Sequence, residues 1–189
     1  DQVPERFGKS IAGVQDFLDW IIEQTMETAC AYKPNSAFYE ALGVPGWELL
    51  GQVIERVHRV GRPVILDAKR GDIASTAAAY AQAAFEVLNA DAITLVPYMG
   101  EDAIVPFLEK GGFAFVLTSP SNVSSRRIVE HGTPTLAECV AQLSVELDER
   151  FPQQVGLVVG ATHPDCVRTL DTASEHLPWL VPGLGAQGG

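Results

Sequence analysis

Apolar residues along this chain follow two spacings, one typical of helices and one typical of buried strands. Between residues 7 and 29 they recur every three or four positions, which predicts an amphipathic helix. The other segments are predicted in the same way. Helical spacing marks residues 47–60, 75–90, 101–110, 135–150 and 164–176, and strand-like apolar runs occupy residues 30–33, 64–69, 91–96, 113–118, 155–160 and 179–182.

Regular alternation of strands and helices predicts an α/β fold with a parallel sheet. The spacing of the strands indicates a TIM-type (β/α)8 barrel, a fold that has eight strands and typically about 250 residues. This chain has 189 residues, and its apolar pattern gives only six strands. We therefore expect a single but incomplete barrel domain over residues 1–189.

The most informative stretch runs from Val64 to Thr76, where an apolar strand ends in charged residues. Successive strand side chains alternate between the two faces of a sheet, so Asp67 and Lys69 share one face. Asp72 follows within three residues, just before an alanine-rich helix. In α/β folds this carboxyl edge of the sheet is where ligands bind and chemistry occurs.

A purely structural interpretation of the same residues is also open. Asp67 and Lys69 could form an ion pair on one face of the strand, and Asp72 could cap the helix by accepting a hydrogen bond from an amide near Ser75. Charges on an otherwise buried strand are costly, however, and charged groups gather at functional sites. Both considerations favour a functional interpretation.

The order Asp-x-Lys-x-x-Asp-Ile-x-x-Thr, formed by Asp67, Lys69, Asp72, Ile73 and Thr76, resembles the signature of orotidine 5′-monophosphate decarboxylases, in particular the bacterial type 2 branch. Further blocks resemble the same family in the same order along nearly the whole chain. They are residues 31–40, 91–100, 118–119, 159–162 and 182–189. The serine-rich segment 119–127 departs from the Thr-Ser-Asn-Pro-Gly pattern expected there.

The resemblance implies a reaction that needs no metal and no cofactor. Loss of the 6-carboxylate of orotidine 5′-monophosphate leaves negative charge on a ring carbon, so the protein must supply fixed charges and a proton. By resemblance, Lys69 is the general acid, Asp67 lies beside the departing carboxylate, Lys33 holds Asp67, and Asp72 completes the network. A lysine at position 33, taken without the motif, would be interpreted as an ordinary strand-end residue.

The same resemblance implies a set of substrate-binding residues and a homodimer. Asp72 and Thr76 are expected to cross a two-fold interface into the site of the neighbouring subunit. Taken alone, Thr76 would be a first-turn helix residue, Ser119 a turn residue, and the loop around Gln187 a plain glycine-rich turn. The substrate-binding residues implied by the resemblance are Ile73, Thr76, Ser119, Pro182 and Gln187.

Composition limits the remaining possibilities. A net charge of −11 argues against nucleic acid or an anionic membrane as a partner, while a small phosphorylated nucleotide needs only a few lysines and backbone amides. The three cysteines are far apart and the four histidines lack metal-ligand spacing, so we expect reduced thiols, a cytoplasmic location and no metal site. No apolar run approaches the roughly 20 residues that cross a bilayer.

Two alternatives to the decarboxylase remain open. One is a Mg²⁺-dependent sugar-phosphate lyase of the same superfamily, in which an acid stands where this chain has Lys33. The other is a non-catalytic barrel fragment that binds a nucleotide or a partner. The departure after Ser119 keeps the second alternative open. So does the expectation, implied by the resemblance, that the first and last strands of the barrel are missing and that the domain is incomplete at both ends.

Overall fold

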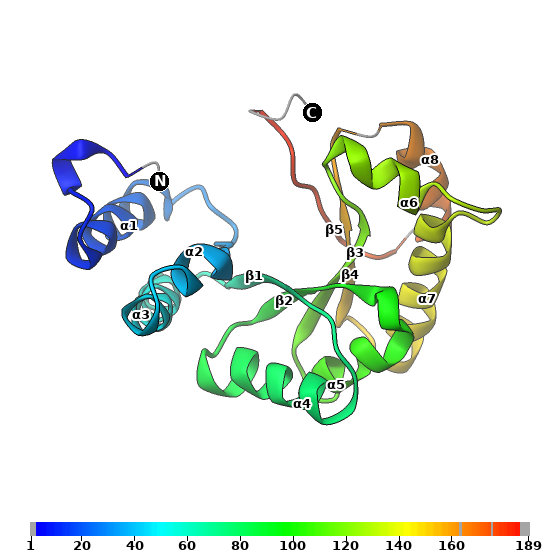
Figure 1. Ribbon diagram of the computed structural model, residues 1–189, viewed down its shortest axis with the longest axis horizontal. Helices are drawn as coiled ribbons and strands as arrows, with labels where there is room; N and C mark the ends of the chain where they lie inside the picture. Colours follow the sequence, from blue (N-terminus) through cyan, green and yellow to red (C-terminus); the bar gives the residue numbers. More distant parts are fainter. Residues whose placement is uncertain (1–2, 163, 175, 186–189) are drawn as a thin grey trace. The chain divides into compact units, whose positions relative to one another are not determined.

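A computed structural model describes residues 3–162, 164–174 and 176–185 (Figure 1). Its contacts divide the chain into two compact units, which are described separately. Unit 1 consists of residues 1–68 and 83–92, and unit 2 consists of residues 69–82 and 93–189. The prediction of one domain over residues 1–189 stays a prediction.

Unit 1 is mostly helical. Ser10 caps α1 because its side chain accepts a hydrogen bond from the amide of Gly13 at 3.1 Å. The helix therefore begins later than the apolar spacing predicts. The core of the unit comes from the buried face of α3, where Leu49, Leu50 and Ile54 are almost fully covered. Its elements are η1 (Glu5–Phe7), α1 (Ile11–Thr25), α2 (Ser36–Glu40), α3 (Val44–Arg59), the start of β1 (Ile65–Arg70) and the π-type turn η2 (Ala83–Val87).

The prediction of a regular strand at residues 30–33 is wrong. The chain forms only two isolated parallel bridges here, Tyr32 with Val64 and Asn35 with Asp67. Pro34 lies between them and has no backbone N–H to donate to a ladder. The carbonyl oxygen of Pro34 still accepts a hydrogen bond from the Asp67 amide at 2.9 Å. The segment therefore lies along β1 without forming a continuous ladder.

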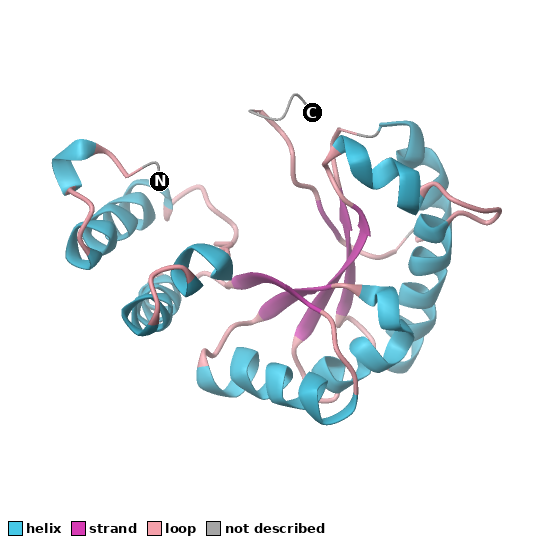
Figure 2. Ribbon diagram, viewed as in Figure 1, coloured by secondary structure: helices cyan, strands magenta, loops and turns pink. Residues whose placement is uncertain are grey.

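Unit 2 holds the end of β1, β2 from Ile93 onward and the remaining strands, and Figure 2 shows the strands and helices. The strand order is β1-β2-β3-β4-β5, and both β3–β4 and β4–β5 are parallel. The elements of the unit are α4 (Ala74–Gln82), β2 (Ala92–Leu95), η3 (Pro97–Ala103), α5 (Val105–Leu108), β3 (Phe113–Ser119), η4 (Val123–Ser125), α6 (Arg126–Val129), α7 (Leu136–Arg150), β4 (Val155–Val159), α8 (Pro164–Ala173) and β5 (Trp179–Leu180).

The core of unit 2 lies between β4 and helices α7 and α8. Leu157 and Val159 of β4 pack with Ala141 of α7 and Leu170 of α8, and all four side chains are buried. Burial of such a layer is the main stabilising term for a sheet covered by helices. The layer supports β4, which pairs with β3, and the candidate residue Ser119 lies at the end of β3.

The strand order confirms the predicted fold class. A doubly wound sheet reverses its strand order at a switch point, whereas a (β/α) barrel keeps its parallel strands in chain order. The helix predicted at 75–90 is divided, because α4 ends at Gln82 and η2 follows it. No helix in the described part of the chain is long and apolar enough to cross a membrane.

Candidate active site

Lys33 and Asp67 form a tight ion pair in unit 1. The Lys33 Nζ lies 2.6 Å from Oδ2 of Asp67, and the carboxylate side chain is only 8% exposed. A carboxylate this well covered is costly unless it is paired and hydrogen-bonded. Both requirements are met here, so the position of the Asp67 negative charge is fixed by the fold.

Asn35 supports the same carboxylate and was not singled out from the sequence. Its Oδ1 accepts a hydrogen bond from the Ala37 amide at 3.0 Å and so caps α2. Its Nδ2 then faces Asp67 and donates to Oδ2 at 3.5 Å. The sequence contains a signal for the capping role of Asn35, because asparagine directly before a helix is a favoured N-cap residue.

A cavity of about 420 Å³ adjoins this ion pair within unit 1, and Lys33, Asn35 and Tyr39 are among its lining residues. Burial raises the pKa of Tyr39 to about 12. Its phenol therefore stays neutral near pH 7, and Lys33 is the cationic residue in the lining.

The strand-to-helix turn after β1 belongs to unit 2 and carries the other charged candidates. Lys69 is exposed and has a left-handed backbone, with φ 46°. The regular alternation of an extended strand therefore stops at this residue. The Lys69 amide donates to the hydroxyl of Thr94 on β2 at 3.0 Å.

Asp72, Ile73 and Thr76 follow on the same turn and on the start of α4. The carboxylate of Asp72 accepts a hydrogen bond from the Ile73 amide at 2.8 Å. Ile73 is 47% exposed and Thr76 is also exposed. The buried face of α4 is instead formed by Ala77 and Ala81.

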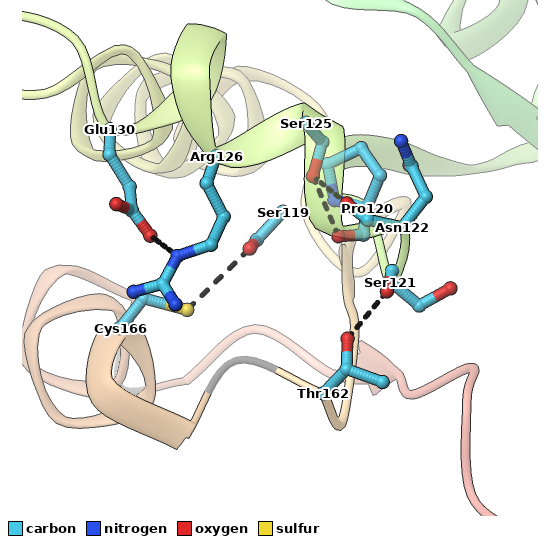
Figure 3. Close-up of polar contacts among 9 residues, drawn as sticks. All are labelled: Ser119, Pro120, Ser121, Asn122, Ser125, Arg126, Glu130, Thr162 and Cys166. Carbon is cyan, nitrogen blue, oxygen red and sulfur yellow. Dashed lines mark hydrogen bonds and ion pairs between the residues drawn. The ribbon is translucent and has the colours of Figure 1, made fainter. Parts of the chain in front are cut away.

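Ser119 ends β3 and is 1% exposed. Its Oγ lies 3.5 Å from the Sγ of Cys166 on α8, as Figure 3 shows. Both residues line a cavity of about 230 Å³, which also includes Arg126 and Glu138. Ser119 therefore contacts α8 in this structure, and its assignment to the substrate stays a prediction.

The segment after Ser119 is held by its own polar contacts (Figure 3). Ser125 donates to the carbonyl of Pro120 at 3.1 Å, and Thr162 donates to the carbonyl of Ser121 at 2.6 Å. A Cβ atom at Gly160 would lie 2.6 Å from the Cα of Ser121. The end of β4 thus lies directly against this segment.

The remaining predicted site residues lie near the end of the chain. Pro182 follows β5, is half-buried, and accepts a hydrogen bond from the Ala161 amide at 2.9 Å. Gln187 lies outside the described residues. Within the described residues, no group of three or more histidine, cysteine, aspartate or glutamate side chains could hold a metal ion.

Comparison with known proteins decides the family. The family model described as "Orotidine 5′-phosphate decarboxylase / HUMPS family" matches residues 9–189. The chain belongs to the orotidine 5′-phosphate decarboxylase family. The relationship predicted from residues 67–76 is thereby confirmed.

Individual members of the decarboxylase family agree closely with the whole chain. Proteins named orotidine 5′-phosphate decarboxylase from Herpetosiphon aurantiacus and Roseiflexus sp. are 45% and 44% identical to it. Each alignment covers 100% of this chain, and 71% and 70% of those proteins, respectively. These bacterial relatives are in keeping with the predicted branch.

Solved structures of the family show the same fold. The structure of Leishmania donovani UMP synthase matches with a TM-score of 0.90 and 45% identity, covering 96% of this chain and 41% of that protein. The L. donovani OMP decarboxylase matches with a TM-score of 0.86 and 43% identity, covering 96% of this chain and 72% of that protein.

Proposed function

We propose that Lys33, Asp67, Lys69 and Asp72 are the charged groups with which this enzyme decarboxylates orotidine 5′-monophosphate to uridine 5′-monophosphate. The reaction is a carboxy-lyase step of de novo pyrimidine biosynthesis. Family membership supports the reaction, and identity of 45% to a decarboxylase supports the substrate. The observation that carries the roles of the residues is the fixed, buried carboxylate of Asp67, held by Lys33 at 2.6 Å.

The chemistry requires one bond to break and one to form. The bond between ring carbon 6 and its carboxylate breaks, CO₂ leaves, and the electron pair stays on the ring carbon. The Lys69 ammonium stabilises that developing charge and donates the proton that forms the new C–H bond. Lys33 keeps the Asp67 carboxylate in place beside the departing group, so both charges are present before the reaction begins.

Substrate recognition falls to Ile73, Thr76, Ser119, Pro182 and Gln187 in this proposal. Ile73 and Thr76 are exposed at the start of α4 and so are free to contact a ligand or a partner. Ser119 reads the polar edge of the pyrimidine through its hydroxyl, which lies 3.5 Å from the Sγ of Cys166. Gln187 bridges the phosphate and the base.

An absorbance assay tests the reaction. Loss of the orotidine 5′-monophosphate signal in excess chelator supports decarboxylation by fixed charges without a metal. Abolition by chelator and recovery with Mg²⁺ would instead support the sugar-phosphate lyases. Tight binding of uridine 5′-monophosphate without any turnover would support a non-catalytic nucleotide-binding protein.

The proposal includes a homodimer in which Asp72 and Thr76 serve the partner's site. Mixing Lys69→Ala with Asp72→Ala tests it, because a hybrid dimer then has one site with both changes and one site with neither. About half of randomly mixed dimers are hybrids, so up to roughly a quarter of native activity returns. No recovery after confirmed subunit exchange would show that each site is built from one chain.

A cytoplasmic location also belongs to this proposal. The three cysteines are free thiols, and Cys30 and Cys139 are exposed. Exposed thiols persist in a reducing compartment. Fractionation of the native host, followed by detection of the chain in the cytosolic fraction, tests the location.

A further inference from the structure

The backbone of Lys69 has an unusual conformation. Its φ is 46°, in the left-handed region that residues with a Cβ atom seldom occupy. Such a conformation persists only where the surroundings hold it, and it is found disproportionately at functional sites. The contacts that hold Lys69 therefore bear on what its side chain does.

Thr94 supplies the most direct of these contacts. Its Oγ1 accepts a hydrogen bond from the Lys69 amide at 3.0 Å, and Thr94 is only 1% exposed. The neighbouring residues on β2, Ile93 and Leu95, are equally buried and apolar. A hydroxyl is costly in such a strand unless it makes hydrogen bonds, so its presence at position 94 calls for a partner.

The next two residues of the turn are also fixed to the end of β2. The carbonyl of Arg70 accepts a hydrogen bond from the Val96 amide at 2.7 Å. A Cβ atom at Gly71 would lie 3.0 Å from the carbonyl oxygen of Val96, so only glycine fits here without a shift. Lys69 and Arg70 are thus each held by a backbone hydrogen bond, and the one from Lys69 is accepted by a side chain.

We propose that Thr94 is a positioning residue that holds the Lys69 backbone in its left-handed conformation and so aims the ammonium at the reacting carbon. This inference rests on the proposed role of Lys69 as the general acid. Thr94 itself need not touch the substrate. Its hydroxyl acts by fixing the amide of the lysine, and a change in that amide's direction turns the Cα–Cβ bond that carries the ammonium.

The choice of substitutions makes the role of the hydroxyl testable. Thr94→Val keeps the shape and volume of the side chain but removes the acceptor for the Lys69 amide. Thr94→Ser keeps the acceptor and removes one methyl group. A role in positioning and a role in packing therefore predict opposite orders for the two variants.

Steady-state kinetics with orotidine 5′-monophosphate gives the first measurement. We expect Thr94→Val to lower kcat about tenfold, equivalent to about 1.4 kcal/mol, while KM changes by less than about twofold. Thr94→Ser should stay within about twofold of wild type in both constants. A larger loss of kcat in Thr94→Ser than in Thr94→Val would overturn the proposal in favour of packing.

Ser144→Ala is the matched control. The Ser144 hydroxyl is fully buried on α7 and donates to the carbonyl of Val140 at 2.8 Å. Its removal deletes a buried hydroxyl far along the chain from the turn after β1. We expect kcat and KM to be unchanged in this variant, whereas an equal loss of kcat would show that any lost buried hydroxyl has the same effect.

Hydrogen exchange of the Lys69 amide, measured by NMR on the full chain, is independent of the reaction. We expect exchange at least about tenfold faster in Thr94→Val than in wild type, and near wild type in Thr94→Ser. Unchanged protection in Thr94→Val would overturn the inference even if the enzyme is active. A wild-type protein that fails to decarboxylate would overturn only the proposed function, because the exchange measurement still reports on the contact.

Discussion

The turns that follow β1 and β3 each connect a strand to a helix, yet their polar residues are held in different ways. The first junction is the turn after β1, and the second junction is the turn after β3. After β1, the backbone of Lys69 is hydrogen-bonded to Thr94 of β2, the backbone of Arg70 is hydrogen-bonded to Val96 just after β2, and Lys69 is exposed. After β3, the side chain of Ser119 is buried and contacts Cys166.

In the proposed mechanism, this difference separates a reactive group, Lys69, from a binding group, Ser119. A general acid must be in place before the reaction, which favours a rigid backbone and an accessible ammonium. A residue that recognises the base can rearrange when the nucleotide arrives, because a cysteine sulfur is a weak hydrogen-bonding partner. The first junction is therefore where substitutions should affect turnover most strongly.

The largest effect is expected from Lys69→Ala. Removal of the proposed general acid should lower kcat by about 10³-fold or more, while affinity for uridine 5′-monophosphate stays within about tenfold of wild type. Turnover is followed by absorbance and affinity by calorimetry, with circular dichroism as a check on folding. Turnover close to wild type in this variant would remove Lys69 from the mechanism.

Gly71→Ala tests the rigidity of the first junction. The added Cβ meets the carbonyl oxygen of Val96 at 3.0 Å, and that oxygen belongs to a backbone that cannot move cheaply. We expect a loss of about 1–3 kcal/mol in the free energy of unfolding, measured in urea, together with lower kcat.

Gly51→Ala provides the control for that substitution. Gly51 lies inside α3, and a Cβ atom there meets nothing within 4 Å. Alanine is the better helix former, so this variant should gain roughly 0.5–1 kcal/mol. A similar change in stability for both variants would show that the contact with Val96 is not restrictive.

A smaller effect is expected from Ser119→Ala at the second junction. A neutral hydrogen bond contributes about 0.5–1.5 kcal/mol, so kcat/KM for orotidine 5′-monophosphate should fall by at most about tenfold, through a higher KM. Cys166→Ala is measured alongside, because it removes the other half of the contact. A loss as large as that of Lys69→Ala would place Ser119 in the chemistry and would remove the distinction between the junctions.

The strained backbone of Lys69 gives a stability difference between two inactive variants. Alanine keeps the cost of a Cβ atom at φ 46°, whereas glycine removes it, so Lys69→Gly should be more stable than Lys69→Ala by about 1 kcal/mol. Gln153, a loop residue with φ 64°, allows the same comparison between its glycine and alanine variants. Equal stability of the two Lys69 variants, with a clear difference at Gln153, would indicate that the backbone at Lys69 relaxes.

The smallest effect is a loss of stability at acid pH that involves Glu138 on α7. Hydrogen bonds from the amide and hydroxyl of Thr135 lower the pKa of Glu138 below its usual value of 4.5. A carboxylate with a lowered pKa stabilises the fold above its usual pKa, and this contribution is lost as the pH falls through the lowered value.

Urea midpoints at pH 6 and pH 3.5 measure that contribution. Glu138→Gln keeps an acceptor for Thr135 but does not titrate, so its midpoint should fall less with pH than that of wild type. Glu146→Gln removes an exposed carboxylate from the same helix as a control. Identical pH dependence in wild type and Glu138→Gln would contradict the expectation.

The sequence predicted the elements with long, clear periodicity, including β1, β3, β4 and α7. It did not reveal α2, because five residues are too few to show a helical period. It also could not show that α4 gives way to a π-type turn at Ala83, because a change in hydrogen-bond register leaves the alanine-rich pattern unaltered. Pro34 was visible, but its effect on the ladder was not anticipated.

For similar reasons, some contacts of the candidate site could be predicted from the sequence and others could not. The Lys33–Asp67 pair followed from the resemblance, and the structure brings the two side chains together. Ser119, which contacts Cys166, lies just after an irregularity in the pairing of β3 with β4, between Leu117 and Ser119, where the regular alternation of β3 ends. Thr94 is a single polar residue in an apolar run, and its partner lies 25 positions away in the sequence.

The double use of the Asn35 side chain links the local unfolding of α2 to the order of Asp67. A five-residue helix has too few internal hydrogen bonds to be stable alone, so α2 depends on its cap and its packing. When α2 opens, the Asn35 amide loses the contact that orients it toward the carboxylate. Opening of α2 therefore weakens the hydrogen bonding of the Asp67 carboxylate without breaking its 2.6 Å contact with Lys33, which lies outside the helix.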